Sequence, residues 1–360
     1  MAMFRPLSRL AVSLTLAVLA VLLGPGDAQA KIKCGSILGP GGAYVLERNL
    51  TCLQVDKAGT EYPDRIGVLK LIGGASLNLN GHTVTCNARD TGPNAKDAWG
   101  IVARDSTVKN GTVRGCGYGV VASGSLVEGM TLDGNGTGVM LRAKFGGGGN
   151  VIMGNTAMNG SFGFGVFEIG GNTLIDNVAK DNEVGFYTVD ADVTLIGNVA
   201  LRNRDFGFLS SALSRLVGNR AEQNGEGYRT EQVSEITGNI AQNNVGAGFV
   251  VQPATRLDLV RDNVARGNGG DGFQVILPRD RSVGTLSSNH AINNLGHGLH
   301  VVDGFGQGFV APTATITGNT AFRNGGGDLA DDTDCRLALW VANRFGTAAQ
   351  PCISSRGLGG

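Results

Sequence analysis

The chain has 360 residues, with 30 Lys and Arg balanced by 30 Asp and Glu. A near-neutral chain without a run of basic residues gives no support for nucleic-acid binding. Glycine supplies 59 residues and aromatic residues only 6%. Because Val, Ile, Leu and Phe recur regularly between the glycines, the composition excludes a disordered linker.

The first thirty residues have the pattern of a secretory signal peptide. Arg5 and Arg9 precede a largely apolar run over residues 10–23, and the segment ends in the small-residue sequence AQA. Such a run is too short for a comfortable membrane span, so we expect no integral membrane segment after cleavage. We therefore expect a secreted or periplasmic protein, in which six cysteines form disulfides because the compartment is oxidising.

A repeat organises most of the remaining chain. Units such as NVAKDNEVGF and NVARGNGGDGF return eight times, and their leading asparagines are 155, 177, 198, 219, 239, 263, 289 and 319. A period in the low twenties indicates a solenoid, and short β-branched segments indicate strands. We predict an all-β fold, a right-handed parallel β-helix of about ten coils over residues 66–330, with an N-terminal cap at 31–65 and a C-terminal cap at 331–360.

Each position in the repeat has an expected place in a coil. The third position is always alanine and should point inward, where neighbouring coils leave room for one methyl group. A glycine then turns the chain, and the residue after it should fill the core: Phe164, Phe186, Phe208, Tyr228, Phe249, Phe273 and Leu299. The asparagines should occupy turns, where they tolerate left-handed backbone and can hydrogen-bond their counterparts in the next coil.

Two early segments, LNLNGHTVTC (77–86) and VKNGTVRGCGYGV (108–120), resemble the opening coils of bacterial secreted right-handed β-helix repeat proteins. This pectin-lyase-like superfamily includes NosD-type proteins and carbohydrate-binding or sugar-cleaving proteins. Segments beginning CGSILG and DCRLAL resemble its two caps. The resemblance implies the fold, and it implies association with an extracellular or cell-envelope polysaccharide.

Six cysteines allow 15 sets of three disulfides. We predict Cys34–Cys52 and Cys335–Cys352, which bracket the entry to and the exit from the stack. We also predict Cys86–Cys116, which join nearly equivalent positions of early coils.

The Gly-His-Gly around His297 invites comparison with a catalytic histidine. In the repeat, however, His297 occupies the position held elsewhere by Phe206, Ala247 and Asp271. The paired carboxylates of a polygalacturonase are missing upstream, as is the Asp-Pro-His-Asp of mannuronan epimerases, so the catalytic residues are unknown. Asp331 and Asp332 belong to the predicted terminal cap.

Other chemistries have candidate residues but no motif. A lyase-type base would be an arginine, drawn from Arg229, Arg256, Arg261, Arg279 and Arg281. Calcium is a possible cofactor, held by Asp190, Asp192, Glu231 and Glu235. No transition-metal site is expected, because His290 should lie on a different strand from His297 and His300.

The most promising surface is the outer side of the strands that contain the glycine and the inward aromatic residue. Its outward positions are Tyr187, Leu209, Arg229, Val250, Gln274 and His300. Longer segments at 252–262, 276–288 and 302–317 should form a wall beside it. We predict that a neutral or acidic glycan is bound by Tyr187, Arg229, Gln274, Arg279, Arg281 and His300.

Three functions remain open at this point. The chain is an exported polysaccharide lyase or related enzyme, a non-catalytic glycan-binding protein, or a structural or adhesive surface rod. The sequence predicts no oligomeric state.

Overall fold

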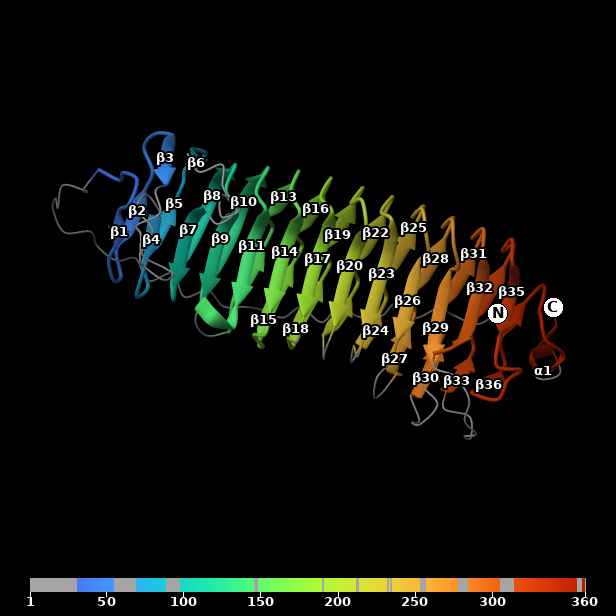
Figure 1. Ribbon diagram of the computed structural model, residues 1–360. Helices are drawn as coiled ribbons and strands as arrows, with labels where there is room; N and C mark the ends of the chain where they lie inside the picture. Colours follow the sequence, from blue (N-terminus) through green and yellow to red (C-terminus); the bar gives the residue numbers. More distant parts are fainter. Residues whose placement is uncertain are drawn as a thin grey trace, which may run out of the picture. The chain divides into compact units, whose positions relative to one another are not determined.

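The computed structural model describes residues 31–54, 69–88, 98–145, 148–189, 191–211, 214–231, 233, 235–252, 257–277, 284–304, 314–354 and 358–359. The expected signal peptide lies outside these residues. Residues 32–360 form one compact unit, built almost entirely of parallel strands (Figure 1). No helix in the described part of the chain is long and apolar enough to cross a membrane.

Sheet A is a 13-stranded parallel sheet in which each strand pairs with its equivalents in the coils before and after. Its strands are β1 (Ile37–Leu38), β4 (Leu69–Leu71), β7 (Trp99–Arg104), β9 (Tyr118–Ser123), β11 (Thr137–Arg142), β14 (Phe162–Phe167), β17 (Val184–Val189), β20 (Phe206–Ser211), β23 (Glu226–Glu231), β26 (Phe249–Gln252), β29 (Phe273–Leu277), β32 (His297–Asp303) and β35 (Gly327–Asp331).

Face B lies beyond sheet A along each coil. Its strands are β2 (Ala43–Val45), β5 (Ser76–Asn78), β12 (Val151–Met153), β15 (Asn172–Ile175), β18 (Val193–Ile196), β21 (Arg215–Val217), β24 (Glu235–Thr237), β27 (Leu257–Arg261), β30 (Gly284–Ser287), β33 (Ala314–Thr317) and β36 (Ala338–Val341). Two long strands, β8 (Thr107–Arg114) and β10 (Leu126–Asp133), continue from face B into face C.

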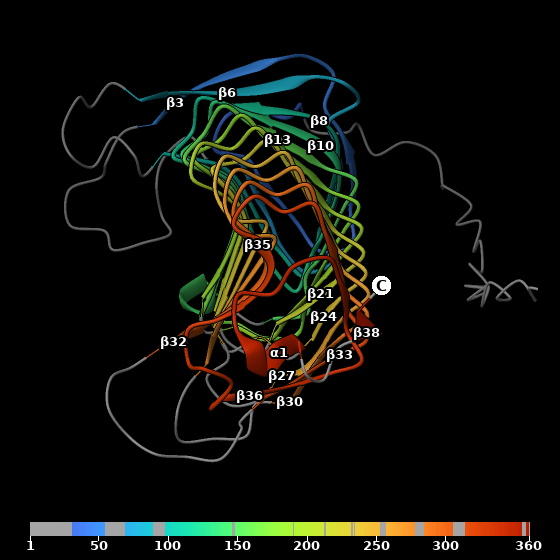
Figure 2. The ribbon, with the colours of Figure 1, turned by 90° about the vertical axis from the view of Figure 1, so that its right-hand side faces the viewer.

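Face C completes the coil. Its strands are β3 (Leu50–Gln54), β6 (Thr83–Ala88), β13 (Thr156–Met158), β16 (Val178–Lys180), β19 (Val199–Leu201), β22 (Arg220–Glu222), β25 (Ile240–Gln242), β28 (Val264–Arg266), β31 (His290–Ile292), β34 (Thr320–Phe322), β37 (Arg344–Phe345) and β38 (Leu358–Gly359). A 3₁₀ turn (Ala143–Phe145) and α1 (Pro351–Ser354) are short additions. Figure 2 looks along the stack of coils. The right-handed parallel β-helix is confirmed.

The core follows the repeat as expected. The alanines at the third position of the units are at most 1% exposed, and so are the aromatic residues that directly follow the turn glycine. From Phe164 to Phe273 the six rings stack one above another, with centroids 4.6–4.9 Å apart and interplanar angles of at most 8°. This separation matches the spacing of paired strands, so each coil adds one ring to the column.

Asparagine ladders run through two corners of the coil. Between faces B and C, Asn219 accepts hydrogen bonds from the backbone N–H and the side-chain amide of Asn198, at 2.9 and 3.0 Å. Its own amide donates to Asn239 and to the carbonyl of Leu195. The same pattern links Asn203, Asn224 and their successors between face C and sheet A, which confirms the predicted contacts between counterparts.

The predicted left-handed backbone falls one residue earlier than expected. Gly218 and Gln223, with φ of 64° and 57°, immediately precede the ladder residues Asn219 and Asn224. The ladder asparagines themselves do not have positive φ. The physical reason is that the turn must be made before the ladder residue, so that its side chain can point into the coil, where it is buried.

The three disulfides are those predicted from the positions of the cysteines. Cys34 joins Cys52, Cys86 joins Cys116 and Cys335 joins Cys352. The first and last tie together the segments at the two ends of the stack, where β2 and β3 pair with β5 and β6, and β37 pairs with β34. No cysteine is left free.

Candidate glycan-binding face

One outward-facing position of sheet A repeats from coil to coil, and we call this series the outer column. Strand pairing aligns its members: Val102, Val121, Met140, Gly165, Tyr187, Leu209, Arg229, Val250, Gln274, His300 and Ala330. The first three are buried in an apolar cluster with Trp99. Gly165, Val250 and Ala330 are also buried, so the accessible members of the column are Tyr187, Leu209, Arg229, Gln274 and His300.

A second outward series lies at the start of the same strands, and we call it the strand-start row. It includes Phe162, Val184, Phe206 and Glu226, which pair in register, and Asp271 and His297 occupy the same repeat position. Residues i and i+3 of a strand normally face opposite sides. Here two consecutive positions, such as Gly227 and Tyr228, both face inward, which brings Glu226 and Arg229 to the same side.

Glycine is required at the first of these two inward positions. A Cβ at Gly227 would lie 2.4 Å from the carbonyl oxygen of Gly248 and 3.0 Å from the Cβ of Ala241. Neither neighbour can move away, because one is backbone and the other is a core methyl group. The glycine directly before each core aromatic residue thus places the strand-start row beside the outer column.

Three aromatic rings form a cluster at the accessible start of the outer column. The ring of Tyr187 stacks on Phe162, with centroids 5.2 Å apart, and meets the edge of Phe167 at 5.3 Å. Gly165 makes this possible, because a Cβ there would lie 2.8 Å from the Phe167 ring. All three rings are partly exposed, and the Tyr187 hydroxyl makes no hydrogen bond to the described residues. Such a surface can stack against the apolar face of a sugar ring.

Arg229 lies in the middle of the face and is held by a carboxylate. Its Nε and Nη2 donate to the two oxygens of Glu226, at 3.0 and 2.8 Å. Its guanidinium also lies over the ring of Phe206, 5.6 Å from the centroid. The hydrogen bonds with Glu226 raise the already high pKa of Arg229. A base for a lyase reaction is therefore not available from Arg229 while this ion pair is intact.

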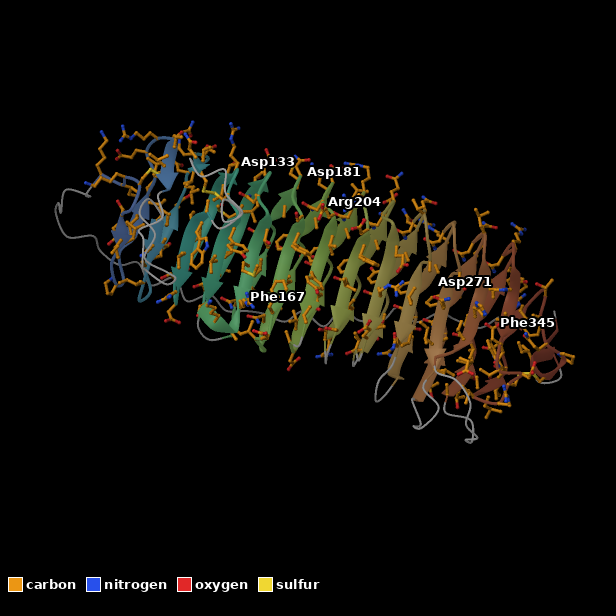
Figure 3. The ribbon with its side chains drawn as sticks, in the orientation of Figure 1. Asp133, Phe167, Asp181, Arg204, Asp271 and Phe345 are labelled. Carbon is orange, nitrogen blue, oxygen red and sulfur yellow. A yellow bond between two sulfur atoms is a disulfide. The ribbon has the colours of Figure 1, made fainter. Side chains whose placement is uncertain are left out.

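Near the C-terminal end, His300 lies between two carboxylates from neighbouring coils. Its Nδ1 is 2.9 Å from Oδ2 of Asp271, and its Nε2 is 3.1 Å from Oδ1 of Asp332. The first contact is a hydrogen bond, whereas the second is an ion pair too poorly aligned for one. The backbone N–H of His297 holds the other oxygen of Asp271 at 2.7 Å. Phe167 and Asp271, labelled in Figure 3, belong to the two separate clusters of the face.

The array of Asp271, His300 and Asp332 favours a protonated imidazole. Burial by itself lowers the pKa of His300, but the contacts with Asp271 and Asp332 outweigh it and raise that pKa above its ordinary value of 6.5. Burial likewise raises the pKa of Asp271, but hydrogen bonds from His300 and from His297 outweigh it and lower that pKa below 3.8. The two carboxylates therefore stabilise the charged form of His300.

These shifts predict a pH dependence of stability. Because the folded-state pKa of His300 is raised, its contribution is complete below pH 6.5 and is lost as pH rises through the folded-state value. The contribution of Asp271 has the opposite sign: it is present above pH 3.8 and is lost as pH falls through the lowered pKa. The stability advantage of the wild type over His300→Gln should therefore shrink as the pH rises above 6.5.

Urea denaturation of both proteins across this pH range measures the difference. His290→Gln, at an exposed position of face C, is the control for removal of an imidazole. An advantage over His300→Gln that stays constant, or grows with pH, would contradict a charged His300.

Four of the six residues predicted to bind a glycan lie on the outer column: Tyr187, Arg229, Gln274 and His300. Arg279 and Arg281 lie outside the described residues, as do Arg256, Asp190 and much of the expected wall. Whether these six residues bind a ligand stays a prediction.

The remaining candidates do not assemble into a site. Arg261 lies on β27 of face B and pairs with Asp262 at 2.9 Å, and Glu235 pairs with Arg215 at 2.7 Å. His290 lies on face C, whereas the rings of His297 and His300 are 4.7 Å apart. Among the described residues, no group of three or more His, Cys, Asp or Glu side chains could hold a metal ion.

Sequence reasoning missed four side chains of this face: Phe162, Phe167, Asp271 and Asp332. Phe162 and Asp271 occupy the strand-start position that also holds His297, so the repeat itself carried the signal. Asp332 was assigned to the terminal cap, yet it follows β35, which pairs with β32. Continuing the alignment by one more coil would have placed it near His300.

Residues 99–232 and 219–339 match a family model described as the right-handed β-helix region. Because these matches span more than half of the sequence, the chain belongs to the right-handed β-helix family. The resemblance found in the sequence is thereby confirmed. No curated protein sequence matches significantly.

Several solved structures are similar at low identity. The periplasmic alginate epimerase AlgG has 14% identity and a TM-score of 0.45, over 89% of this chain and 79% of that one. The A-module of the Azotobacter vinelandii mannuronan C-5 epimerase AlgE4 has 15% identity and a TM-score of 0.38, over 86% and 88%. The catalytic domain of a GH87 α-1,3-glucanase in complex with nigerose has 14% identity and a TM-score of 0.36, over 86% of this chain and 64% of that one. At these values the similarity says nothing about what this chain binds.

Proposed function

We propose that this protein binds an extracellular or cell-envelope polysaccharide along the outer face of sheet A. The observation that carries the proposal is the alignment of partly exposed aromatic and polar side chains, Tyr187, Arg229, Gln274 and His300, in one column. Tyr187 and His300 lie on β17 and β32, five strand steps apart, which corresponds to about 24 Å at about 4.8 Å per step. A single sugar cannot reach both ends, so the ligand is a polymer that lies along the stack of coils.

The same face favours binding over lyase activity. A β-eliminating lyase needs a free base for the sugar C–H, and the nominated Arg229 is engaged by Glu226. Export to the periplasm or the exterior is part of the proposal. Three disulfides and the signal-like first thirty residues support it.

The test compares two matched aromatic residues on different faces. Phe206 lies on sheet A beneath Arg229, at 5.6 Å, and Phe322 lies on face C beneath Arg344, at 5.8 Å. On a panel of soluble polysaccharides in affinity electrophoresis, Phe206→Ala should weaken binding by at least about tenfold, or about 1.4 kcal/mol. Phe322→Ala should stay within about twofold, as surface substitutions away from a site do.

Equal losses in the two variants would contradict a site on sheet A. Absence of binding to every polysaccharide on the panel would instead support the structural or adhesive alternative.

A further inference from the structure

We infer that the polysaccharide bound on this face is uncharged, and that the face discriminates against uronate polymers. The inference rests on the proposed function and concerns the same surface. The sequence left a neutral and an acidic glycan open. The distribution of ion pairs on the outer column decides between them.

The outer column has two cationic side chains, and carboxylates of the protein already engage both. Arg229 presents to Glu226 the forked pair of donors that would otherwise bind a uronate carboxylate. His300 faces Asp271 through one ring nitrogen and Asp332 through the other. At Arg229 a uronate would meet only the N–H donors that Glu226 leaves over, on a guanidinium whose charge Glu226 already neutralises. At His300 it would have to displace an internal carboxylate.

Among the described residues of this face between Arg229 and His300, the charge that remains accessible is negative. The side chain of Asp332 is 53% exposed beside His300. Glu231 is exposed at the end of β23, two residues beyond Arg229 and on the same side of the strand. Two acidic groups flanking neutralised cations give a potential that repels a polyanion at low ionic strength.

Two polar side chains of the outer column without a hydrogen-bond partner among the described residues can bind the hydroxyl groups of a sugar. The Gln274 amide makes no hydrogen bond to the described residues, so both its donor and its acceptor are free for a ligand. The Tyr187 hydroxyl is likewise free, next to rings that can cover the apolar face of a pyranose. Neutral sugars present this combination of hydroxyl groups and C–H faces.

Matched pairs of polysaccharides that differ only in the carboxylate at C6 test the inference: a mannan with a mannuronan, a galactan with a galacturonan, and a glucan with a glucuronan. The disulfide-bonded wild-type protein should bind at least one neutral member at least about tenfold more tightly than its uronate counterpart. The ratio should fall in about 0.5 M salt, which screens the repulsion.

Glu226→Gln provides the gain-of-function arm, because it frees Arg229 and removes one negative charge. It should raise affinity for the uronate member by about fivefold or more, about 1 kcal/mol. Glu222→Gln is the matched control, since Glu222 pairs with Arg220 at 2.6 Å on face C. It should leave the ratio unchanged.

A wild-type preference for the uronate member that Phe206→Ala abolishes would overturn this inference and leave the proposed function standing. So would a Glu226→Gln variant with an unchanged ratio. Failure of all six polysaccharides to bind would contradict the proposed function itself.

Discussion

Phe208→Ala is expected to lower the free energy of unfolding by about 3–5 kcal/mol, the cost of replacing a buried phenylalanine with a cavity. Phe208 is 1% exposed and lies between two rings, with centroids 4.7 Å from Phe186 and 4.7 Å from Tyr228. The rigid stack of strands above and below cannot collapse into the space. Each neighbouring ring therefore loses one of its two stacking partners.

Chemical denaturation followed by far-UV circular dichroism measures the loss. Leu209→Ala is the matched control: it removes an apolar side chain of the same strand from the outer, partly exposed side. It should cost under about 1 kcal/mol. Similar losses for Phe208→Ala and Leu209→Ala would mean that the inward and outward assignments of β20 are wrong.

Asn219→Ala is expected to lower the free energy of unfolding by about 2–6 kcal/mol. The cause is the loss of hydrogen bonds in the ladder between faces B and C, since the substitution opens no large cavity. The substitution leaves the backbone N–H of Asn198 and the carbonyl of Leu195 without the contacts that the Asn219 side chain provides. Each buried polar group left unsatisfied costs about 1–3 kcal/mol. The loss should appear as a lower denaturation midpoint.

Arg220→Ala serves as its control, because Arg220 is the next residue, is exposed, and makes only a surface ion pair with Glu222. Its midpoint should match that of the wild type. If Asn219→Ala were equally well tolerated, the ladder would contribute nothing measurable to stability, and the burial of so many asparagines would need another explanation.

The repeat made the core predictable from sequence. Ala221 and Phe208 recur at fixed positions, and a side chain that must fit between identical neighbours has one orientation open to it. The disulfides followed from position for a related reason, since cysteines that bracket an end of the stack have few partners within reach.

The face was harder to predict, because it depends on departures from the repeat. Gly165 replaces a side chain in the outer column, and only that absence lets Phe167 lie against Tyr187. The pairing of Glu226 with Arg229 contradicts the alternation of a regular strand, and it follows from two consecutive inward residues. Asp332 reaches His300 across a coil of about 30 residues, from His300 to its strand partner Ala330. This coil is longer than the preceding repeats, so counting at the usual spacing does not give the register.

The ladder between face C and sheet A ends on a different residue. Asn324 passes its backbone N–H and its amide to Oδ1 of Asp328, and Oδ2 of Asp328 accepts from the backbone of Gly346 and Thr347. An asparagine side chain accepts hydrogen bonds from one neighbour and donates one to the next, whereas an ionised aspartate can only accept them. Asp328 lies in the same coil as Asn324, at the repeat position that Gly298 holds one coil earlier. Its carboxylate therefore takes the place of the asparagine that a further coil would supply, and the ladder ends there. Because each ladder asparagine contacts only its two neighbours, coils before Asn324 could be added or removed while this corner keeps the same terminal acceptor.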